Sequence, residues 1–298
     1  MPDPERLPTR DLLLVLAVVA LWGFNFVPIR WALDEVPPLA LASLRFLLAA
    51  VPLVFLVKRP AAPAWSVVAY GLAIGVGQFG LLFLGIAVGM PAGLASLVAQ
   101  AQVFLTIGLA AWLLRDRVAP RQALGALVAA SGLALLVGAK LASGARATAL
   151  GLALCLLAAL SWAIGNVVAK HAARARAADA PPLDMFALVV WSSLVAPVPL
   201  AVLSFLFEGG LAPLHAIASM SPRAWASTLF MAWGATLFGF AAWNRLLHRH
   251  PTGRIAPFAL LIPIAGLTSA WLVLGEALSW LDAGAGALVL AGLALTVL

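Results

Sequence analysis

The chain has 298 residues, of which 64% are hydrophobic and only 10% are charged, with a formal net charge of +7. Soluble domains are roughly half apolar and a quarter charged, so this composition excludes a soluble globular protein and predicts a multi-pass membrane protein. The single cysteine, Cys155, excludes a disulfide framework and a cysteine-based metal site. The basic residues stand between apolar runs, so they indicate membrane topology and not a nucleic-acid partner.

Ten apolar runs are long enough to cross the membrane, since about 20 helical residues span about 30 Å of hydrocarbon. In chain order these predicted helices cover residues 11–33, 37–57, 65–87, 91–114, 120–139, 148–170, 182–207, 223–247, 253–274 and 279–298. The gaps between them are short, and many contain proline or glycine. We therefore expect an all-α membrane protein with ten transmembrane helices and no soluble domain.

The positions of the basic residues predict which side each gap faces. Most of the 18 Lys and Arg residues precede the first predicted helix or fall in every second gap, as at Arg6, Lys58 and Arg115. Cytoplasmic loops carry the excess of positive charge in membrane proteins. We therefore expect a protein of a bacterial-type inner membrane with both the N- and C-termini in the cytoplasm.

The two halves of the chain resemble each other when one is shifted by 160 positions. Asp116 then meets Glu276, and the run GLALLV meets GLALTV, with no gap across the third to fifth predicted helices. The repeats are residues 1–140 and 141–298. Five helices in each repeat thread the second half from the opposite side, which is the inverted arrangement of many alternating-access transporters. The alternative is chance similarity between segments rich in Ala, Leu and Gly.

The carboxamides that are candidates for mid-membrane polar groups are Asn25, Gln78, Gln100, Gln102, Asn166 and also Asn244. Lipid offers no hydrogen-bond partner, so such groups face other helices or a water-filled cavity. Gln100 and Gln102 are about 200° apart around a helix, so they face different ways. We expect Gln100, which shares its face with a serine one turn earlier, to line a cavity and Gln102 to bond a neighbouring helix.

Aromatic residues accompany these amides: Trp22, Phe24, Phe79, Phe83, Trp162, Phe240 and Trp243. Amides with aromatic walls suit a small zwitterion with an uncharged side chain, although most aromatic residues in helices only pack. The predicted substrate-binding residues are Trp22, Asn25, Gln78, Phe79, Phe83, Gln100, Trp162, Asn166 and Trp243.

Three further residues are predicted to have gating or structural roles. Arg45 lies in the second predicted helix, where its stem can snorkel outward as an anchor. If it faces the cavity instead, it can bind a carboxylate in a bidentate manner. Pro257 and Pro263 mark either a hinge or a static kink in the ninth predicted helix. No Asp or Glu lies in the middle of a predicted helix, so we expect transport to depend little on a pH gradient.

Several segments carry a family resemblance. The runs LWGFNFVPIRWAL, PPLALASLRFLLAAVPLVFLVKRP, GMPAGLASLVAQAQVF and WSSLVAPVPL resemble the drug/metabolite transporter superfamily. The chain is most similar to its ten-helix EamA-type exporters of the cysteine and O-acetylserine group, and less similar to exporters of aromatic amino acids and of threonine or homoserine. The resemblance implies an inverted-repeat carrier that exports amino acids and related metabolites by alternating access.

Single positions also match this family. Trp22 and Asn25 match its first-helix motif, Arg45 matches its second-helix arginine, and Gly275-Glu276 matches the Gly-Glu after the ninth helix. The chain departs from the pattern after the fourth helix, where it has Arg115-Asp116. That departure weakens any shared role for the Asp116 carboxylate.

Other functions fit the sequence less well. A sugar-nucleotide exporter requires several basic residues in its cavity, and an exporter of lipophilic cationic drugs requires an acidic one. An intramembrane enzyme requires a nucleophile, metal ligands or a catalytic pair, and the one histidine cluster, His248-Arg249-His250, is expected in a short solvated loop. We expect no cofactor or metal, and partners limited to an amino-acid substrate and membrane lipids. Small residues in the fifth and tenth predicted helices form a packing or dimer face, so a monomer or weak homodimer is expected.

Overall fold

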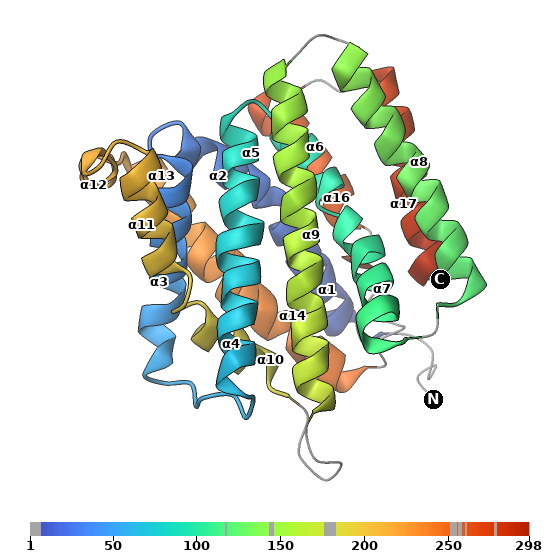
Figure 1. Ribbon diagram of the computed structural model, residues 1–298, viewed down its shortest axis with the longest axis horizontal. Coiled ribbons are helices and arrows are strands. Elements are labelled where there is room, and N and C mark those ends of the chain that lie inside the picture. Colours follow the sequence, from blue (N-terminus) through green and yellow to red (C-terminus); the bar gives the residue numbers. More distant parts are fainter. Residues whose placement is uncertain are drawn as a thin grey trace.

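The computed structural model describes residues 7–297 except for 117, 143–145, 176–182, 251–254, 256–257, 260 and 277–278. These described residues form a bundle of helices and contain no strand (Figure 1). The prediction of an all-α fold is therefore confirmed.

The helices of the first half are α1 (Thr9–Phe24), α2 (Phe26–Leu33), α3 (Pro38–Val54), α4 (Ala64–Gly71), η1 (Leu72–Gly80), α5 (Leu81–Ala87), α6 (Ala92–Val98), α7 (Ala101–Leu114) and α8 (Pro120–Ala142). Those of the second half are α9 (Arg146–Arg174), α10 (Met185–Ser192), α11 (Pro197–Phe207), α12 (Ala212–Ala218), α13 (Pro222–Leu229), η2 (Phe230–Phe238), α14 (Gly239–Arg249), α16 (Leu261–Ser269), η4 (Ala270–Leu274) and α17 (Trp280–Val297). The η elements are π-helical. The short helix α12 lies in a loop where the sequence predicted no helix.

Six helical stretches among the described residues are apolar and long enough to cross a membrane: Thr9–Leu33, Ala64–Ala87, Ala92–Leu114, Ala149–Arg174, Met185–Phe207 and Pro222–Trp243. Three shorter apolar helices accompany them: Pro38–Val54, Leu261–Leu274 and Ala283–Leu295. A chain with this many apolar helices is a multi-pass membrane protein.

Proline explains two of the interruptions within these helical stretches. Pro28 has no N–H to donate to the carbonyl of Phe24, which is where α1 ends and α2 follows. Pro197 interrupts the ladder between α10 and α11 in the same way, and its own carbonyl accepts a hydrogen bond of 2.8 Å from Ser43 Oγ of α3. The carbonyl of Pro197 at the start of α11 thus joins this helix to α3.

The helices pack through small residues where they approach closely. At one edge of the bundle α8 and α17 lie side by side (Figure 1). A Cβ added to Gly132 would come within 2.7 Å of the Ala285 carbonyl, and one added to Gly292 would overlap the Gly125 carbonyl. These glycines therefore serve packing between α8 and α17 within the chain, one of the two roles expected for them.

The long helix α9 packs against α4, η1, α5 and α7. On the other side of the bundle α1 packs against α14 and α16, and α3 packs against α11. The largest core cluster includes Phe46, Phe83 and Ile86, which are at most 4% exposed. This core holds α3, η1 and α5 together and fixes the walls of the site described next.

Candidate functional site

A pocket lies where α3, α4, η1, α10, η2 and α14 approach one another, and its cavity volume is about 20 Å³, room for about one water molecule. Small-molecule sites occupy roughly 300–1,000 Å³ and are mostly apolar with a few polar groups. The wall of this pocket includes four aromatic rings and the hydroxyls of two serines and one threonine: Phe46, Tyr70, Phe79, Phe240, Ser192, Ser193 and Thr236. This chemistry suits a small amphipathic molecule such as an amino acid, and the surrounding helices have to move apart before such a molecule can enter.

Two of the three π-helical segments among the described residues, η1 and η2, border this pocket. The segment η1 contributes Gly75 and Phe79, and η2 contributes Thr236. Within η2 the Thr236 hydroxyl donates to the carbonyl of Met231, five residues earlier, at 2.9 Å. A Cβ at Gly75 would overlap Ala196 at the junction between α10 and α11. π-helical turns are rare and occur frequently at functional sites, so their presence on two walls marks this region.

Arg45 on α3 is buried beside the pocket, only 3% exposed. Its Nη2 donates to Thr236 Oγ1 at 3.0 Å, and the guanidinium carbon lies 3.8 Å from the ring centroid of Phe79. The rings of Phe46 and Phe83 stand 5.6 and 5.9 Å away. Nε and Nη1 of Arg45 have no hydrogen-bond partner. The expectation that this side chain snorkels outward is therefore wrong, because the aromatic rings around it hold it inside the bundle.

Five of the predicted aromatic residues lie at or beside the pocket. Phe79 lines it, and Phe83 packs edge-on against Phe79 at 5.9 Å between centroids. On the far wall Trp22 lies 5.4 Å from the ring of Phe240 and 5.2 Å from Trp243, and its Nε1 donates to the Ala235 carbonyl at 2.8 Å. Phe24, by contrast, packs against Phe230. The packing of helices that are distant in sequence thus joins rings from both halves.

Three predicted amides are buried. Asn25, at the junction between α1 and α2, is 7% exposed, and Gln78 in η1 and Gln100 at the junction between α6 and α7 are each 6% exposed. The side-chain oxygens of Asn25 and Gln78 have no hydrogen-bond partner. A buried polar atom without a partner costs about 1–3 kcal/mol, so each of these two amides requires an explanation.

Asn166 is engaged differently. Its Nδ2 donates to Gln102 Oε1 at 2.8 Å and to Thr106 Oγ1 at 3.1 Å, which joins α9 to α7. The expectation that Gln102 bonds a neighbouring helix is confirmed. Trp162, also on α9, packs against the largest core cluster. Neither Asn166 nor Trp162 lines the pocket described above.

The predicted proline positions are placed only in part. Pro263 is buried within α16. Pro257 lies outside the described residues. Next to Pro263 in sequence, α16 approaches α1 closely, since a Cβ at Gly23 would overlap Ala265 and come within 2.7 Å of the Ile262 carbonyl.

Several pocket residues escaped the sequence analysis. Thr236, Tyr70, Ser192 and Ser193 were not singled out, although the serines stand in the run WSSLVAPVPL. Hydroxyls in an apolar helix often bond the preceding turn, as both serines do to the Val189 carbonyl. The sequence therefore gave no sign that these residues also border a pocket.

Three carboxylates close one end of the bundle, which we call the carboxylate end: Glu35, Glu208 and Glu276. Each accepts hydrogen bonds at the N-terminus of a distant helix, where backbone N–H groups lack partners. Glu208 accepts from the N–H groups of Leu39 and Ala40 at 2.8 and 3.1 Å.

Glu276 accepts from the N–H groups of Ala92 and Gly93, both at 2.8 Å. Glu35 accepts from Ser221 N at 2.7 Å and Ser221 Oγ at 2.6 Å, and these bonds lower the pKa of Glu35. The carboxylate end is thus joined by contacts between residues more than 160 positions apart.

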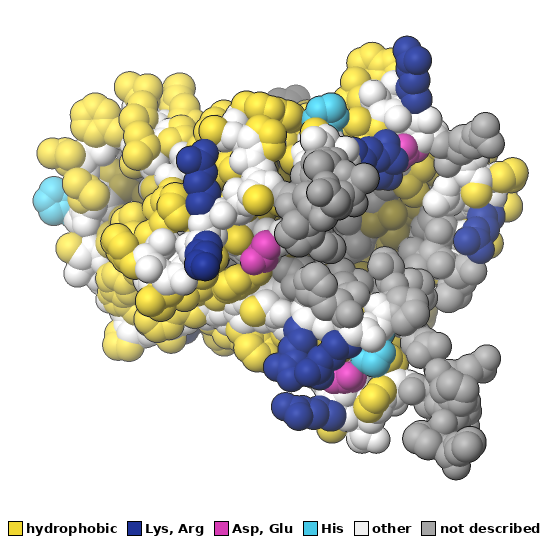
Figure 2. Space-filling model, turned by 90° about the horizontal axis from the view of Figure 1, so that it is seen from below, with side chains coloured by type: hydrophobic (Ala, Val, Ile, Leu, Met, Phe, Trp, Pro, Cys, Tyr) yellow, Lys and Arg dark blue, Asp and Glu magenta, His cyan; other side chains and the backbone are white. Residues whose placement is uncertain are grey.

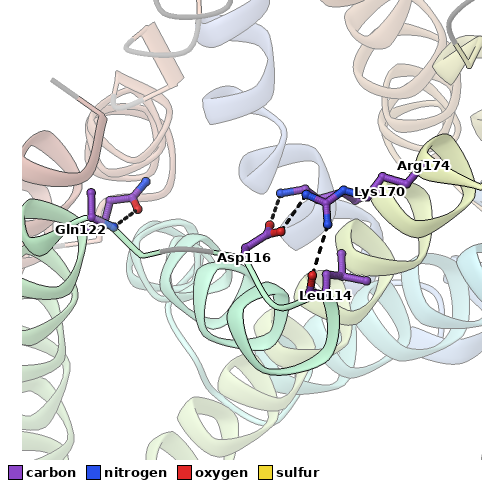
Figure 3. A network of polar contacts seen from close by, with 6 residues as sticks. Leu114, Asp116, Gln122, Lys170 and Arg174 are labelled. Carbon is purple, nitrogen blue, oxygen red and sulfur yellow. Dashed lines mark hydrogen bonds and ion pairs between the residues drawn. The ribbon is translucent and has the colours of Figure 1, made fainter. Parts of the chain in front are cut away.

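The opposite end is joined by ion pairs, and Figure 2 shows Lys and Arg side chains (dark blue) beside acidic ones (magenta) there. Asp116 binds Lys170 and Arg174 of α9 (Figure 3), the latter at 2.7 Å. The hydrogen bond from Lys170, followed by that from Arg174, lowers the pKa of Asp116. We call this the basic end.

His250, at the basic end, is not the solvated loop residue that the sequence predicted. Its Nε2 lies 2.7 Å from Asp11 Oδ2, its side chain is 13% exposed, and Arg249 stands 3.6 Å from the same carboxylate. Within the described part of the chain, no group of three or more His, Cys, Asp or Glu residues is placed to hold a metal ion.

Comparison with known proteins identifies the family. The model of the EamA-like transporter family matches residues 9–138 and again residues 149–298. The chain belongs to the EamA-like transporter family. This membership confirms the resemblance seen in the sequence and the prediction of a transporter, not an enzyme.

Individual relatives agree with this membership. A protein of Salmonella typhimurium named "Probable amino-acid metabolite efflux pump" is 41% identical over 97% of this chain and 95% of its own length. An Escherichia coli protein of the same name is 40% identical over the same shares of the two chains. A Streptantibioticus cattleyicolor protein named "Probable terminal-alkyne amino-acid exporter" is 30% identical over 95% of this chain and 91% of its own.

The fold has also been seen in a solved protein. The match to one crystal structure covers 97% of this chain and 96% of the chain in that structure, with a TM-score of 0.61 and 22% sequence identity. That likeness shows that the two proteins share an overall fold.

Proposed function

We propose that this protein exports amino-acid metabolites across the bacterial inner membrane by alternating access through a central cavity. The observation that carries the proposal is the identity of 41% and 40%, over nearly the full length, to two proteins named as amino-acid metabolite efflux pumps. The chemistry of the pocket wall supports the proposal, because its aromatic rings can contact the apolar part of an amino acid and its Ser and Thr hydroxyls can bond the polar part.

The proposed architecture is ten transmembrane helices in two inverted five-helix repeats, residues 1–140 and 141–298. One support is that the same family model matches each half of the chain. A second support is that contacts recur when the halves are exchanged. The first predicted helix packs against the ninth, as α1 against α16, and the sixth packs against the fourth, as α9 against α7. The π-helical segments η1 and η2 also occupy corresponding helices.

The proposed orientation places the basic end in the cytoplasm, together with both termini. The excess of Lys and Arg in the gaps on that side supports it, because positive charge is retained in cytoplasmic loops. The pocket residues Tyr70, Ser192 and Phe240 lie in the parts of their helices nearer the basic end. Together with the joined carboxylate end, this supports a state that is shut toward the outside.

The proposed binding residues are those that the sequence pointed to, namely Trp22, Asn25, Gln78, Phe79, Phe83, Gln100, Trp162, Asn166 and Trp243. Arg45 and Pro263, with Pro257, are proposed to shape or gate the path. The packing of α8 against α17 through Gly132 and Gly292 occupies small residues within one chain. It supports a monomer, or at most a weak homodimer, as the transporting unit.

The test is uptake of a panel of radiolabelled amino acids and O-acylated amino acids into liposomes that contain the purified protein, against protein-free liposomes. We expect saturable uptake of at least one zwitterion with an uncharged side chain, and less than a twofold change when a pH gradient is imposed. Failure to carry any member of the panel would overturn the proposal, and a tenfold gain from the gradient would overturn the mechanism without proton coupling.

The same liposomes test the proposed residues. Gln100→Ala and Trp162→Ala are expected to abolish uptake while the protein still elutes as a folded species. Matched controls are Gln122→Ala, near the start of α8, and Trp280→Ala, whose side chain is 94% exposed. Normal uptake by the double variant of Gln100 and Trp162 would remove both from the site.

A further inference from the structure

Arg45 carries a positive charge into the middle of the bundle without an anion to balance it. Within the described residues its guanidinium makes one hydrogen bond, to the neutral hydroxyl of Thr236, and two of its nitrogens have no partner. Charged residues inside membrane helices are costly and nearly always pair with another group or serve a ligand. The guanidinium of Arg45 can therefore still donate hydrogen bonds to an anionic group.

The described neighbours of Arg45 fix the position of its guanidinium but provide no negative charge to neutralise it. The Arg45 guanidinium carbon lies over the ring of Phe79, 3.8 Å from its centroid, and this cation–π contact stabilises the positive charge. Thr236 is itself fixed by its hydrogen bond to the Met231 carbonyl in η2. An arginine whose plane and one nitrogen are fixed in this way is pre-organised for a planar partner.

The pocket and the guanidinium share their walls. Phe46, Phe79 and Thr236 line the pocket and also contact Arg45. Nε and Nη1 are shielded in this structure, so an occupant of the pocket reaches them when one of the shared rings swings aside. A cargo molecule can therefore reach the charge only when the helices that carry these shared residues move apart and the pocket widens.

We propose that Arg45 binds the α-carboxylate of the exported amino-acid metabolite, and that Thr236 positions the guanidinium for it. This inference rests on the proposed function. A carboxylate matches the planar fork of a guanidinium through two parallel N–H···O bonds, which a neutral cargo cannot form. Binding at this site therefore depends more on the free α-carboxylate of the cargo than on the side chain of the cargo.

The first test changes the cargo and leaves the protein intact. Uptake of the best-carried radiolabelled amino acid of the panel into liposomes is measured. The same amino acid without label, or its α-carboxamide, is added on the same side of the membrane as a competitor. The carboxamide keeps the side chain and the ammonium group and loses the anion. We expect it to compete at least tenfold more weakly than the acid, and equal competition would overturn the inference.

The second test changes the protein. Arg45→Gln is expected to raise the apparent KM for the acid at least tenfold, with Arg45→Lys intermediate because an ammonium keeps the charge and loses the fork. Thr236→Val, which keeps the charge and removes its positioning bond, is expected to raise KM severalfold with a smaller loss of maximal rate. The matched control is Arg30→Gln, since Arg30 is half-exposed and paired with Asp34.

The decisive readout is selectivity. In Arg45→Gln the preference for the acid over the carboxamide should fall from at least tenfold to about one, whereas a purely structural arginine would slow both competitors alike. A variant that retains the full preference would overturn the inference, and so would wild-type protein without any preference. Wild-type protein that carries no amino acid at all would instead overturn the proposed function, and this inference with it.

Discussion

Two turns of the protein, 160 positions apart, have the same backbone and different partners. After α7, the N–H of Asp116 donates to the Ala110 carbonyl at 3.3 Å, and after η4, the N–H of Glu276 donates to the Ala270 carbonyl at 3.3 Å. The preceding residue is left-handed in both turns, with φ of 56° at Arg115 and 69° at Gly275.

The carboxylates that follow these turns serve different ends of the bundle. Glu276 accepts from two backbone N–H groups of α6, and Asp116 binds two partly exposed side chains of α9. Local sequence similarity therefore reproduces the turn, while the neighbouring helix decides what the carboxylate does. The departure of Arg115-Asp116 from the Gly-Glu pattern coincides with this loss of the shared role.

The largest expected difference between the turns comes from removing each carboxylate. Glu276→Ala should lower the free energy of unfolding by about 2 kcal/mol, because it strips a charged acceptor from unpaired N–H groups at a helix N-terminus. Asp116→Ala should lower it by clearly less, because its partners are solvated cations. Reversible unfolding in detergent, followed by tryptophan fluorescence, measures both, and equal losses would contradict the distinction.

Exchanging the left-handed residues should produce opposite changes. Gly275→Ala is expected to cost about 1 kcal/mol from backbone strain alone, because an added Cβ would meet no atom within 4 Å. Arg115→Gly is expected to gain up to about 1 kcal/mol by removing the same strain, less the entropy that glycine adds to the unfolded chain. The same unfolding measurement applies, and a loss of stability in Arg115→Gly would break the equivalence of the two turns.

High salt should increase the difference between the stability losses caused by removing the Asp116 and Glu276 carboxylates. At 1 M salt the screening length falls to about 3 Å, so the small loss caused by Asp116→Asn should shrink toward zero. The loss caused by Glu276→Gln should persist, because its hydrogen bonds to backbone N–H groups are direct contacts within the bundle. Melting temperatures of both variants and the wild type at low and high salt check this, and parallel behaviour would argue against it.

The smallest expected effect is a dependence on pH at the basic end. The Lys170 and Arg174 side chains hold the pKa of Asp116 below its usual 3.8, so ionised Asp116 stabilises the folded state above that value. This contribution is lost as the pH falls through the lowered pKa. The gap in melting temperature between wild type and Asp116→Asn should therefore close below about pH 4. A gap that widens there would show that the ion pairs do not set this pKa.

The arrangement of the amides shows where prediction from sequence stops. Spacing alone placed Gln100 and Gln102 on different faces, and Gln102 does bond a neighbouring helix. Spacing did not reveal that its partner is Asn166, because the register of α9 against α7 depends on side chains along both helices. For the same reason it did not reveal that the oxygens of Asn25 and Gln78 are left without partners.

Arg45 shows the same limit more sharply. Its position in the second predicted helix was evident, and both an outward anchor and a cavity residue were compatible with that position. Arg45 lies inside the bundle because the rings of Phe46, Phe79 and Phe83 enclose its guanidinium. Thr236, from the other half of the chain, accepts a hydrogen bond from it. Apart from the contact with the adjacent Phe46, these contacts join residues that are distant in sequence, up to 191 positions apart for Thr236.

The sequence by itself determined the membrane class, the all-α fold, the family and most helix boundaries, because lipid forces the backbone to satisfy its own hydrogen bonds within apolar segments of a set length. Only the tertiary structure decided which polar groups meet, where the pocket lies and which charge is left unpaired. Those features arise between helices, where close packing of glycines and aromatic rings sets distances of a few ångströms that no single segment encodes.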